Sequence, residues 1–192
     1  MGIEVREVRQ GDKKAFRDFL DVVDTIYEGD PNHVRPLGMD VGDRLGQKKK
    51  KFFEHAEGTA WVAYRNGKPV GRISAQIDRL HLERHGEKVG FFGFLDTIDD
   101  VEVTRALLAE AERWNRDKGM VAMRGPLSMN INEEVGCLVE GFDTPPMVMM
   151  PHHRAYQGGL IEQAGLPKLK DFYAWSYDVG TVPTRAQRAH DD

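Results

Sequence analysis

Cysteine is almost missing from this chain of 192 residues, which contains only Cys137. A single cysteine excludes a disulfide within the chain and is typical of a reducing compartment. Long apolar runs are missing too, because no stretch approaches the roughly 20 apolar residues that span a bilayer. Residues 1–12 also lack the apolar region of a signal peptide. We therefore expect a cytoplasmic protein with no membrane partner.

An excess of basic residues is also lacking. The chain has 27 Lys and Arg against 31 Asp and Glu, a formal net charge of −4. This balance provides no overall field that would attract nucleic acid, so we expect no nucleic-acid partner. Hydrophobic residues make up 40% and charged residues 30%, which is ordinary for a globular domain. We expect one domain over residues 1–180, and a polar tail or truncated linker at 181–192.

Hydrophobic periodicity predicts strands and helices in an α/β order with a mixed sheet. The expected strands are 3–8, 59–64, 69–77, 89–98, 121–124 and 169–179, and the expected helices begin at Asp12, Asp99 and His153. Asn66-Gly67, between two apolar runs, is a strong hairpin signal. The strand at 89–98 and the strand at 121–124 should be parallel, because helix 99–118 connects them.

The loop before helix 99–118 is acidic and contains no glycine. It carries Asp96, Asp99 and Asp100, and the spacing of Asp99 and Glu102 predicts a capping box at the start of the helix. In the preceding strand, Gly90 and Gly93 indicate a bulge or a close approach of another backbone.

Strand, loop, helix and strand over 89–126 resemble the cofactor-binding core of the GNAT superfamily of acetyl-CoA-dependent N-acetyltransferases. Over about 30–179, several segments are similar to the N-terminal half of a bacterial family of tandem GNAT-like proteins. These segments are HVRPLGMD, FFEHAEGTAWVAYRNGKPVGRISAQID, GFFGFLDTIDD, AERWNRDKGM, RGPLSMNINEEVGCLVEGFDTPPMVMMPH and LIEQAGLPKLKDFYAWSYDV. The resemblance implies a mostly antiparallel sheet flanked by helices, and a second GNAT-like domain after this one.

The resemblance also implies a site for acetyl-CoA. In the family, pantetheine adds to the backbone edge of the strand that corresponds to Phe92, Gly93, Phe94 and Leu95, so we expect this edge to be open. The family's glycine-rich pyrophosphate loop corresponds here to Asp96-Thr97-Ile98-Asp99-Asp100-Val101-Glu102. Its carboxylates repel a diphosphate, and Arg105 is the only nearby cation.

Catalysis in the family needs a base for the amine and an acid for the leaving thiolate. Glu133 or Glu134 could be the base, and Asn130 and Asn132 could orient the substrate; the same residues could instead cap a turn and a short helix. Ile161 stands where many members have the tyrosine acid. Tyr156 and Tyr173 lie nearby and fit packed aromatic residues as well, and we keep Tyr173 as a candidate acid.

Two functions remain open at this point. The first is an N-acyltransferase that transfers an acetyl group from acetyl-CoA to a small-molecule or peptide amine. The alternative is a catalytically silent GNAT-like module that binds a small ligand or packs on a second domain or a second copy. We expect no metal site, because His152 and His153 have no further ligands at useful spacing and fit surface or capping roles.

Overall fold

The computed structural model describes residues 2–45 and 51–175, and a five-stranded sheet lies at the centre of this part of the chain. In spatial order the strands are β1 (Ile3–Glu7), β2 (Ala56–Arg65), β3 (Lys68–Asp78), β4 (Val89–Thr97) and β5 (Ala122–Arg124). The first four pair antiparallel, and β4 pairs parallel with β5. The expected mixed, mostly antiparallel sheet is confirmed.

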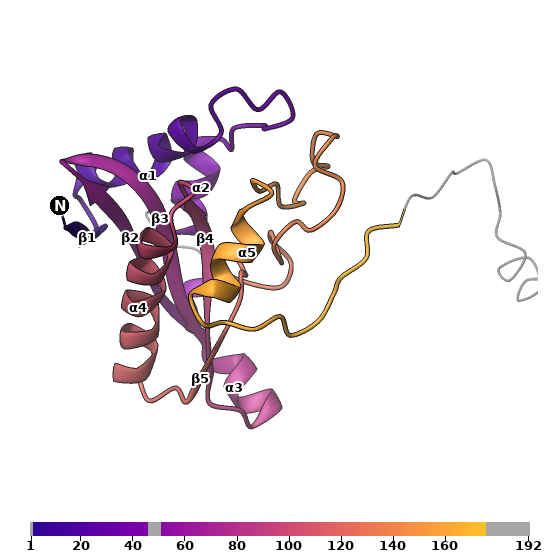
Figure 1. Ribbon diagram of the computed structural model, residues 1–192. Helices are drawn as coiled ribbons and strands as arrows, with labels where there is room; N and C mark the ends of the chain where they lie inside the picture. The colour runs from indigo at the N-terminus through magenta and orange to yellow at the C-terminus, as the bar shows by residue number, and fades with distance from the viewer. Residues whose placement is uncertain (1, 46–50, 176–192) are drawn as a thin grey trace, which may run out of the picture.

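Helices cover both faces of this sheet (Figure 1). They are α1 (Lys13–Ile26), α2 (Gly38–Arg44), α3 (Arg79–His85), α4 (Val101–Asp117) and α5 (Gln157–Gln163), with a short 3₁₀ turn at Lys51–Glu54. On one face, Leu107 of α4 and Ile161 of α5 pack on the sheet. On the other, Phe19 of α1 and Val41 of α2 enclose a second core. Within the described residues, no helix is long and apolar enough to cross a membrane.

The hairpin of β2 and β3 forms at the predicted turn. Asn66 and Gly67 have φ angles of 53° and 75°, the left-handed conformation that a tight hairpin turn requires. Arg65 lies opposite Lys68 at the end of the ladder. These two strands are long enough to form the middle of the sheet, and they hold β4 in place for the site.

Strand β4 is buried along its whole length and contains a bulge. Its register with β3 shifts between Arg72 and Ser74, and Phe94 has a φ of 47°. As a result Phe92 and Leu95 pack in the α4 core, whereas Phe94 packs in the α1 core. The bulge thus directs the residues after it, including Asp96, toward the segment that follows α1.

Two expected elements differ from those observed, and one observed helix was not expected. Residues 169–175 form no strand, and Leu169, Tyr173 and Trp175 are exposed, because no neighbouring strand of the described residues bonds their backbone. The rest of that expected strand and the tail at 181–192 lie outside the described residues. The helix expected to begin at His153 begins only at Gln157. Helix α3 occupies part of a segment where we predicted no element.

Candidate functional site

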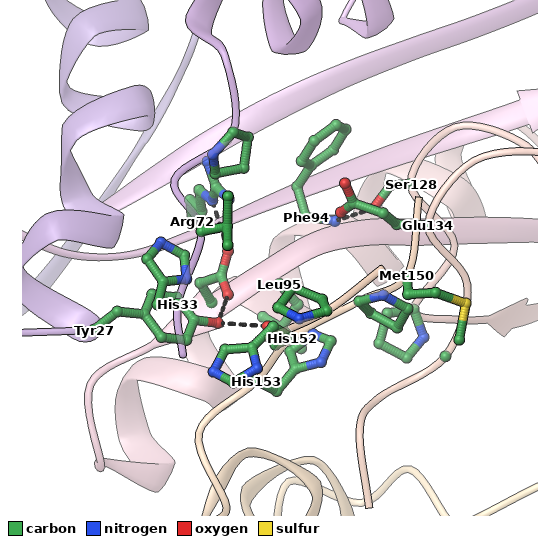
Figure 2. A pocket seen from close by; sticks show the side chains of 17 residues that line it. Tyr27, His33, Arg72, Phe94, Leu95, Ser128, Glu134, Met150, His152 and His153 are labelled. Carbon is green, nitrogen blue, oxygen red and sulfur yellow. Dashed lines mark hydrogen bonds and ion pairs between the residues drawn. The ribbon is translucent and has the colours of Figure 1, made fainter. Parts of the chain in front are cut away.

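A narrow cavity of about 60 Å³ lies where β4 ends (Figure 2). The segment after α1 contributes Tyr27 and His33, and β4 contributes residues 94–96. Its other walls come from the loops at 126–136 and 146–153. Loops from distant parts of the sequence therefore meet at one end of a buried strand, a usual place for a binding site.

A buried ion pair forms one wall of the cavity. Nε and Nη2 of Arg72 lie 2.8 and 2.7 Å from Oδ2 of Asp96, and the Tyr27 hydroxyl donates to Oδ1 at 2.5 Å. Burial alone would raise the pKa of Asp96, but the charge of Arg72 and these hydrogen bonds outweigh it and hold that pKa below its usual value. Asp96 thus belongs to the strand and to a closed network, and not to an acidic loop.

His33 stacks on Tyr27, with ring centroids 3.9 Å apart and an interplanar angle of 3°. Neither ring nitrogen of His33 has a hydrogen-bond partner among the described residues, although both nitrogens are shielded from solvent. Burial lowers the pKa of His33, so its imidazole is neutral at pH 7 and can accept a proton. His33 was not predicted as a site residue from the sequence. It lies in the HVRPLGMD segment, which is one of the segments similar to tandem GNAT-like proteins.

The side chains of the other two histidines at the cavity are shielded from solvent, which corrects the expectation of surface roles. His153 is 8% exposed, and its Nδ1 accepts the backbone N–H of Leu138 at 3.2 Å. Burial lowers the pKa of His153. Nε2 of His152 lies 3.0 Å from a carboxylate oxygen of Asp30. Figure 2 shows both rings beside Tyr27 and His33. His152 thus binds the 146–153 loop to the segment after α1, and His153 binds the same loop to Leu138.

Glu134 is one of the two predicted bases, and it lines the cavity. Its Oε1 lies 3.0 Å from Nη1 of Arg44, whose side chain is 6% exposed. Glu133, the other predicted base, lies 3.9 Å from Nε of the same arginine and is not among the cavity-lining residues. Asp40 also pairs with Arg44, at 2.8 Å. Among the described residues, three carboxylates thus surround this guanidinium group, and these four side chains together have a net negative charge.

The edge of β4 is not open, contrary to the expectation for residues 92–95. The backbone N–H of Leu127 donates to the carbonyl of Phe92 at 2.7 Å, and the N–H of Phe94 donates to Oγ of Ser128 at 3.3 Å. A Cβ at Gly93 would lie 2.3 Å from the Leu127 carbonyl oxygen, so only glycine permits this approach. The predicted close backbone contact is therefore confirmed, and it is made by the chain itself.

Side chains at the start of α5 occupy the continuation of that edge. Oε1 of Gln157 accepts the N–H of Thr97 at 3.2 Å, and the hydroxyl of Tyr156 donates to the Thr97 carbonyl at 2.9 Å. Burial raises the pKa of Tyr156 to about 12. Tyr156 is thus a packed aromatic residue with a satisfied hydroxyl group.

The N-terminus of α4 carries a capping carboxylate that belongs to Asp100, one residue after the predicted Asp99. Oδ1 of Asp100 accepts the N–H groups of Glu102 and Val103 at 2.9 and 3.3 Å, and Arg65 pairs with its other oxygen at 2.7 Å. Arg105 pairs with Glu102 and also donates to the carbonyl of Gln163. The groups that would hold a diphosphate here already have partners, so these residues do not fit one.

The remaining predicted site residues lie apart from the cavity. Oδ1 of Asn130 accepts the N–H of Asn132 at 2.8 Å, which closes a turn as the alternative interpretation predicted, although no helix follows. Tyr173 is 77% exposed and does not line the cavity. In the described ranges 2–45 and 51–175, no group of three or more His, Cys, Asp or Glu side chains could hold a metal ion.

Solved structures share this arrangement of strands and helices. A tandem GNAT protein from the clavulanic acid biosynthesis pathway superposes with a TM-score of 0.54 and 16% identity, over 85% of this chain and 43% of its own. An aminoglycoside acetyltransferase from an uncultured soil metagenomic sample, in complex with sisomicin, superposes with a TM-score of 0.53 and 11% identity, over 92% of this chain and 96% of its own. The chain has the GNAT fold.

Two curated proteins are similar in sequence to this GNAT-fold chain. Protein YghO of Escherichia coli strain K12 is 44% identical over 163 residues, which are 85% of this chain and 42% of the relative. The bacterial ceramide synthase of Caulobacter vibrioides is 45% identical over 175 residues, which are 90% of this chain and 46% of the relative. The chain thus spans slightly less than half the length of these relatives. No family model matches it.

Proposed function

We propose that the chain is a domain of an N-acyltransferase that transfers an acyl group from an acyl-CoA, such as acetyl-CoA, to an amine. The GNAT fold and the similarity to a bacterial ceramide synthase support this proposal. A ceramide is an amide of a long-chain amine, so we take a long-chain amine as the acceptor in preference to a peptide. The observation that carries the proposal is the cavity where β4 ends, with neutral His33 and Glu134 in its walls.

Glu134 and His33 have different roles toward the amine. Excess negative charge around Arg44 and Glu134 attracts the ammonium form, which dominates at neutral pH. The unpartnered imidazole of His33 then takes one proton from the ammonium, which frees the nitrogen lone pair for attack on the thioester carbonyl. Attack forms the amide bond and breaks the C–S bond, and the thiolate of coenzyme A takes up a proton from the surroundings. Glu134, held by Arg44, provides the negative charge that attracts the ammonium group into the cavity.

A second function is favoured by a specific observation. Leu127, Ser128 and Gln157 already bond the edge of β4, and Asp100 already caps α4. Pantetheine pairing along β4 would require the segment at 127–128 to separate from the strand. This arrangement suits the alternative, a catalytically silent GNAT-like module that packs on a second domain or a second copy.

Coenzyme binding separates the two proposals. A ligand that binds the native state raises its stability by mass action, so the melting temperature of the full chain should rise with acetyl-CoA concentration if this domain holds the thioester. A known GNAT acetyltransferase, melted in parallel, is the positive control. If the control is stabilised by millimolar acetyl-CoA and this chain is not, this chain does not hold the coenzyme and the silent module is the better account.

Light scattering adds the second observation. The silent module predicts a dimer, or a stable complex with a following domain. A monomer that converts thioester to amide would overturn that alternative.

A further inference from the structure

Two segments that line the cavity also expose large apolar side chains to solvent. In the first, Val34 and Leu37 are 61% and 73% exposed. In the second, residues 147–150 are 78%, 93%, 51% and 43% exposed. We call these six side chains, Val34, Leu37, Met147, Val148, Met149 and Met150, the apolar rim. Val34 and Met150 are themselves lining residues, so the rim continues from the cavity wall onto the surface.

The two segments of the apolar rim are held side by side. Nδ2 of Asn32 donates to the carbonyl of Phe142 at 3.1 Å, and Asp30 pairs with His152 at 3.0 Å. Figure 1 shows the loop after α1 and the loop before α5 on the same side of the molecule. Exposed apolar surface gathered beside a cavity is typical of a binding surface, and methionine side chains adapt to flexible apolar ligands.

Charge and size indicate the ligand. Among the described residues, the carboxylates of Asp96 and Glu134 outnumber the guanidinium group of Arg72 in the cavity wall. Asp40 and Glu133, which do not line the cavity, add negative charge around Arg44, so this end of the site favours a cation. The cavity, at about 60 Å³, has room for an ammonium group and a few carbon atoms. A longer chain attached to that ammonium has to leave the cavity, and the surface that it meets on leaving is the apolar rim.

We propose that the apolar rim binds the aliphatic chain of a long-chain primary amine whose ammonium group enters the cavity beside Glu134. The proposal rests on the amine acceptor proposed above and assigns the surface that selects it by chain length. The apolar surface and the excess carboxylates match the two ends of one amphiphile. Neither a neutral lipid surface nor an apolar patch on a second copy would account for the carboxylates.

The test measures amine binding to the full chain without any thioester. Calorimetry compares decylamine, kept below its critical micelle concentration, with butylamine. Because each buried methylene group strengthens binding, decylamine should bind roughly 100-fold more tightly. The double variant Met147→Gln, Val148→Asn should weaken decylamine binding roughly 10-fold and leave butylamine unchanged. Val121→Asn, at a site that is 82% exposed beside the opposite end of β4, is the matched control and should change neither affinity.

Methyl NMR of methionine locates the bound chain. Decylamine should shift the methyl signals of Met147, Met149 and Met150 and leave those of Met120 and Met123 unchanged. Equal affinity for both amines, equal effects of the rim variant and of Val121→Asn, or shifts at Met120 and Met123 would each overturn the proposal. Sedimentation of the chain with phosphatidylcholine vesicles in the absence of amine would assign the rim to a membrane surface, and a dimer abolished by the rim variant would assign it to a second copy.

These outcomes are distinct from failure of the acyltransferase proposal. Binding of decylamine at the rim with no acyl transfer would leave the binding site standing and remove the enzymatic function. Acyl transfer with equal kcat/KM for butylamine and decylamine would support the enzymatic function and overturn the role of the apolar rim.

Discussion

At the scale of single residues, the ion pair of Arg72 and Asp96 determines the shape of the cavity wall. Both residues are buried, with exposed fractions of 5% and 6%, and Tyr27 donates to the same carboxylate. A buried pair is costly to form, but removing one partner is costlier because the other charge remains uncompensated. The Tyr27 ring, on which His33 stacks, is therefore positioned by an interaction that tolerates little change.

Asp96→Asn should lower the free energy of unfolding by about 3 kcal/mol, because it leaves the Arg72 guanidinium buried without a countercharge. Urea denaturation followed by circular dichroism measures this loss. The matched control, Asp24→Asn, breaks an exposed ion pair with Arg35 and should change the stability little. Equal losses in the two variants would show that the buried network does not hold this wall.

The buried His153 predicts a pH dependence of stability. Its folded-state pKa lies below the usual 6.5, so the unfolded chain binds protons more readily than the folded chain below that pH. The contribution of His153 is complete above pH 6.5 and is lost as the pH falls toward its folded pKa. Wild-type protein should therefore unfold at a lower urea concentration near pH 5.5 than near pH 7.5.

His153→Asn should make this pH dependence shallower, because the variant cannot take up a proton, while its side-chain oxygen can still accept the N–H of Leu138. His33 and His81 also have lowered pKa values and should preserve part of the slope. If the stability of the variant changes with pH as steeply as that of the wild type, His153 is not the group that titrates.

At the scale of elements, the N-terminus of α4 depends on one side chain. Asp100→Ala removes the oxygen that accepts two backbone N–H groups and should cost about 1 kcal/mol. Asp100→Asn keeps an acceptor and loses only the charge and the pair with Arg65, so it should cost less. Urea denaturation of both variants gives the comparison. A loss as large in Asp100→Asn as in Asp100→Ala would assign the effect to charge and not to capping.

The elements predicted correctly from sequence have strong local signals. Asn66-Gly67 specifies its own turn, and the apolar stripe of α4 matches a helical period over 17 residues. The segment at 169–175 carries a strand-like pattern, but a strand also needs a partner, which a local pattern does not reveal. The capping residue was predicted one position too early, because Asp99 has Glu102 three residues later and so matches the capping box, whereas Asp100 caps the helix with its own carboxylate alone.

The site was less predictable because long-range contacts build it. Glu134, which lines the cavity, was proposed from its expected place after a strand, and its role as a base stays a prediction. His33 meets Tyr27 and the cavity only through the fold. His152 and His153 were predicted to be surface residues, because the residues next to them in the sequence do not indicate hydrogen bonds with the distant Asp30 and Leu138. Likewise, Gly93 indicated a close approach, but the sequence did not say that Leu127 would make it.

At the scale of the whole molecule, the described residues contain a cavity of about 60 Å³, a rim of apolar side chains and a closed β4 edge. We propose that the cavity and the apolar rim together bind a long-chain amine. The third limits access of a thioester, and the chain spans slightly less than half the length of its curated relatives. An assay of amide formation by this chain therefore tests whether the amine and the thioester are bound together.

The most direct measurement is amide formation by the purified full chain with acetyl-CoA and decylamine, followed by mass spectrometry. The account predicts N-acetyldecylamine above the protein-free background, and a rate roughly 100-fold lower in His33→Gln, because that variant lacks the proposed base. The control variant Val121→Asn should retain the wild-type rate. Amide formation that is equal with and without protein, or that is unaffected by His33→Gln, would contradict the central claim.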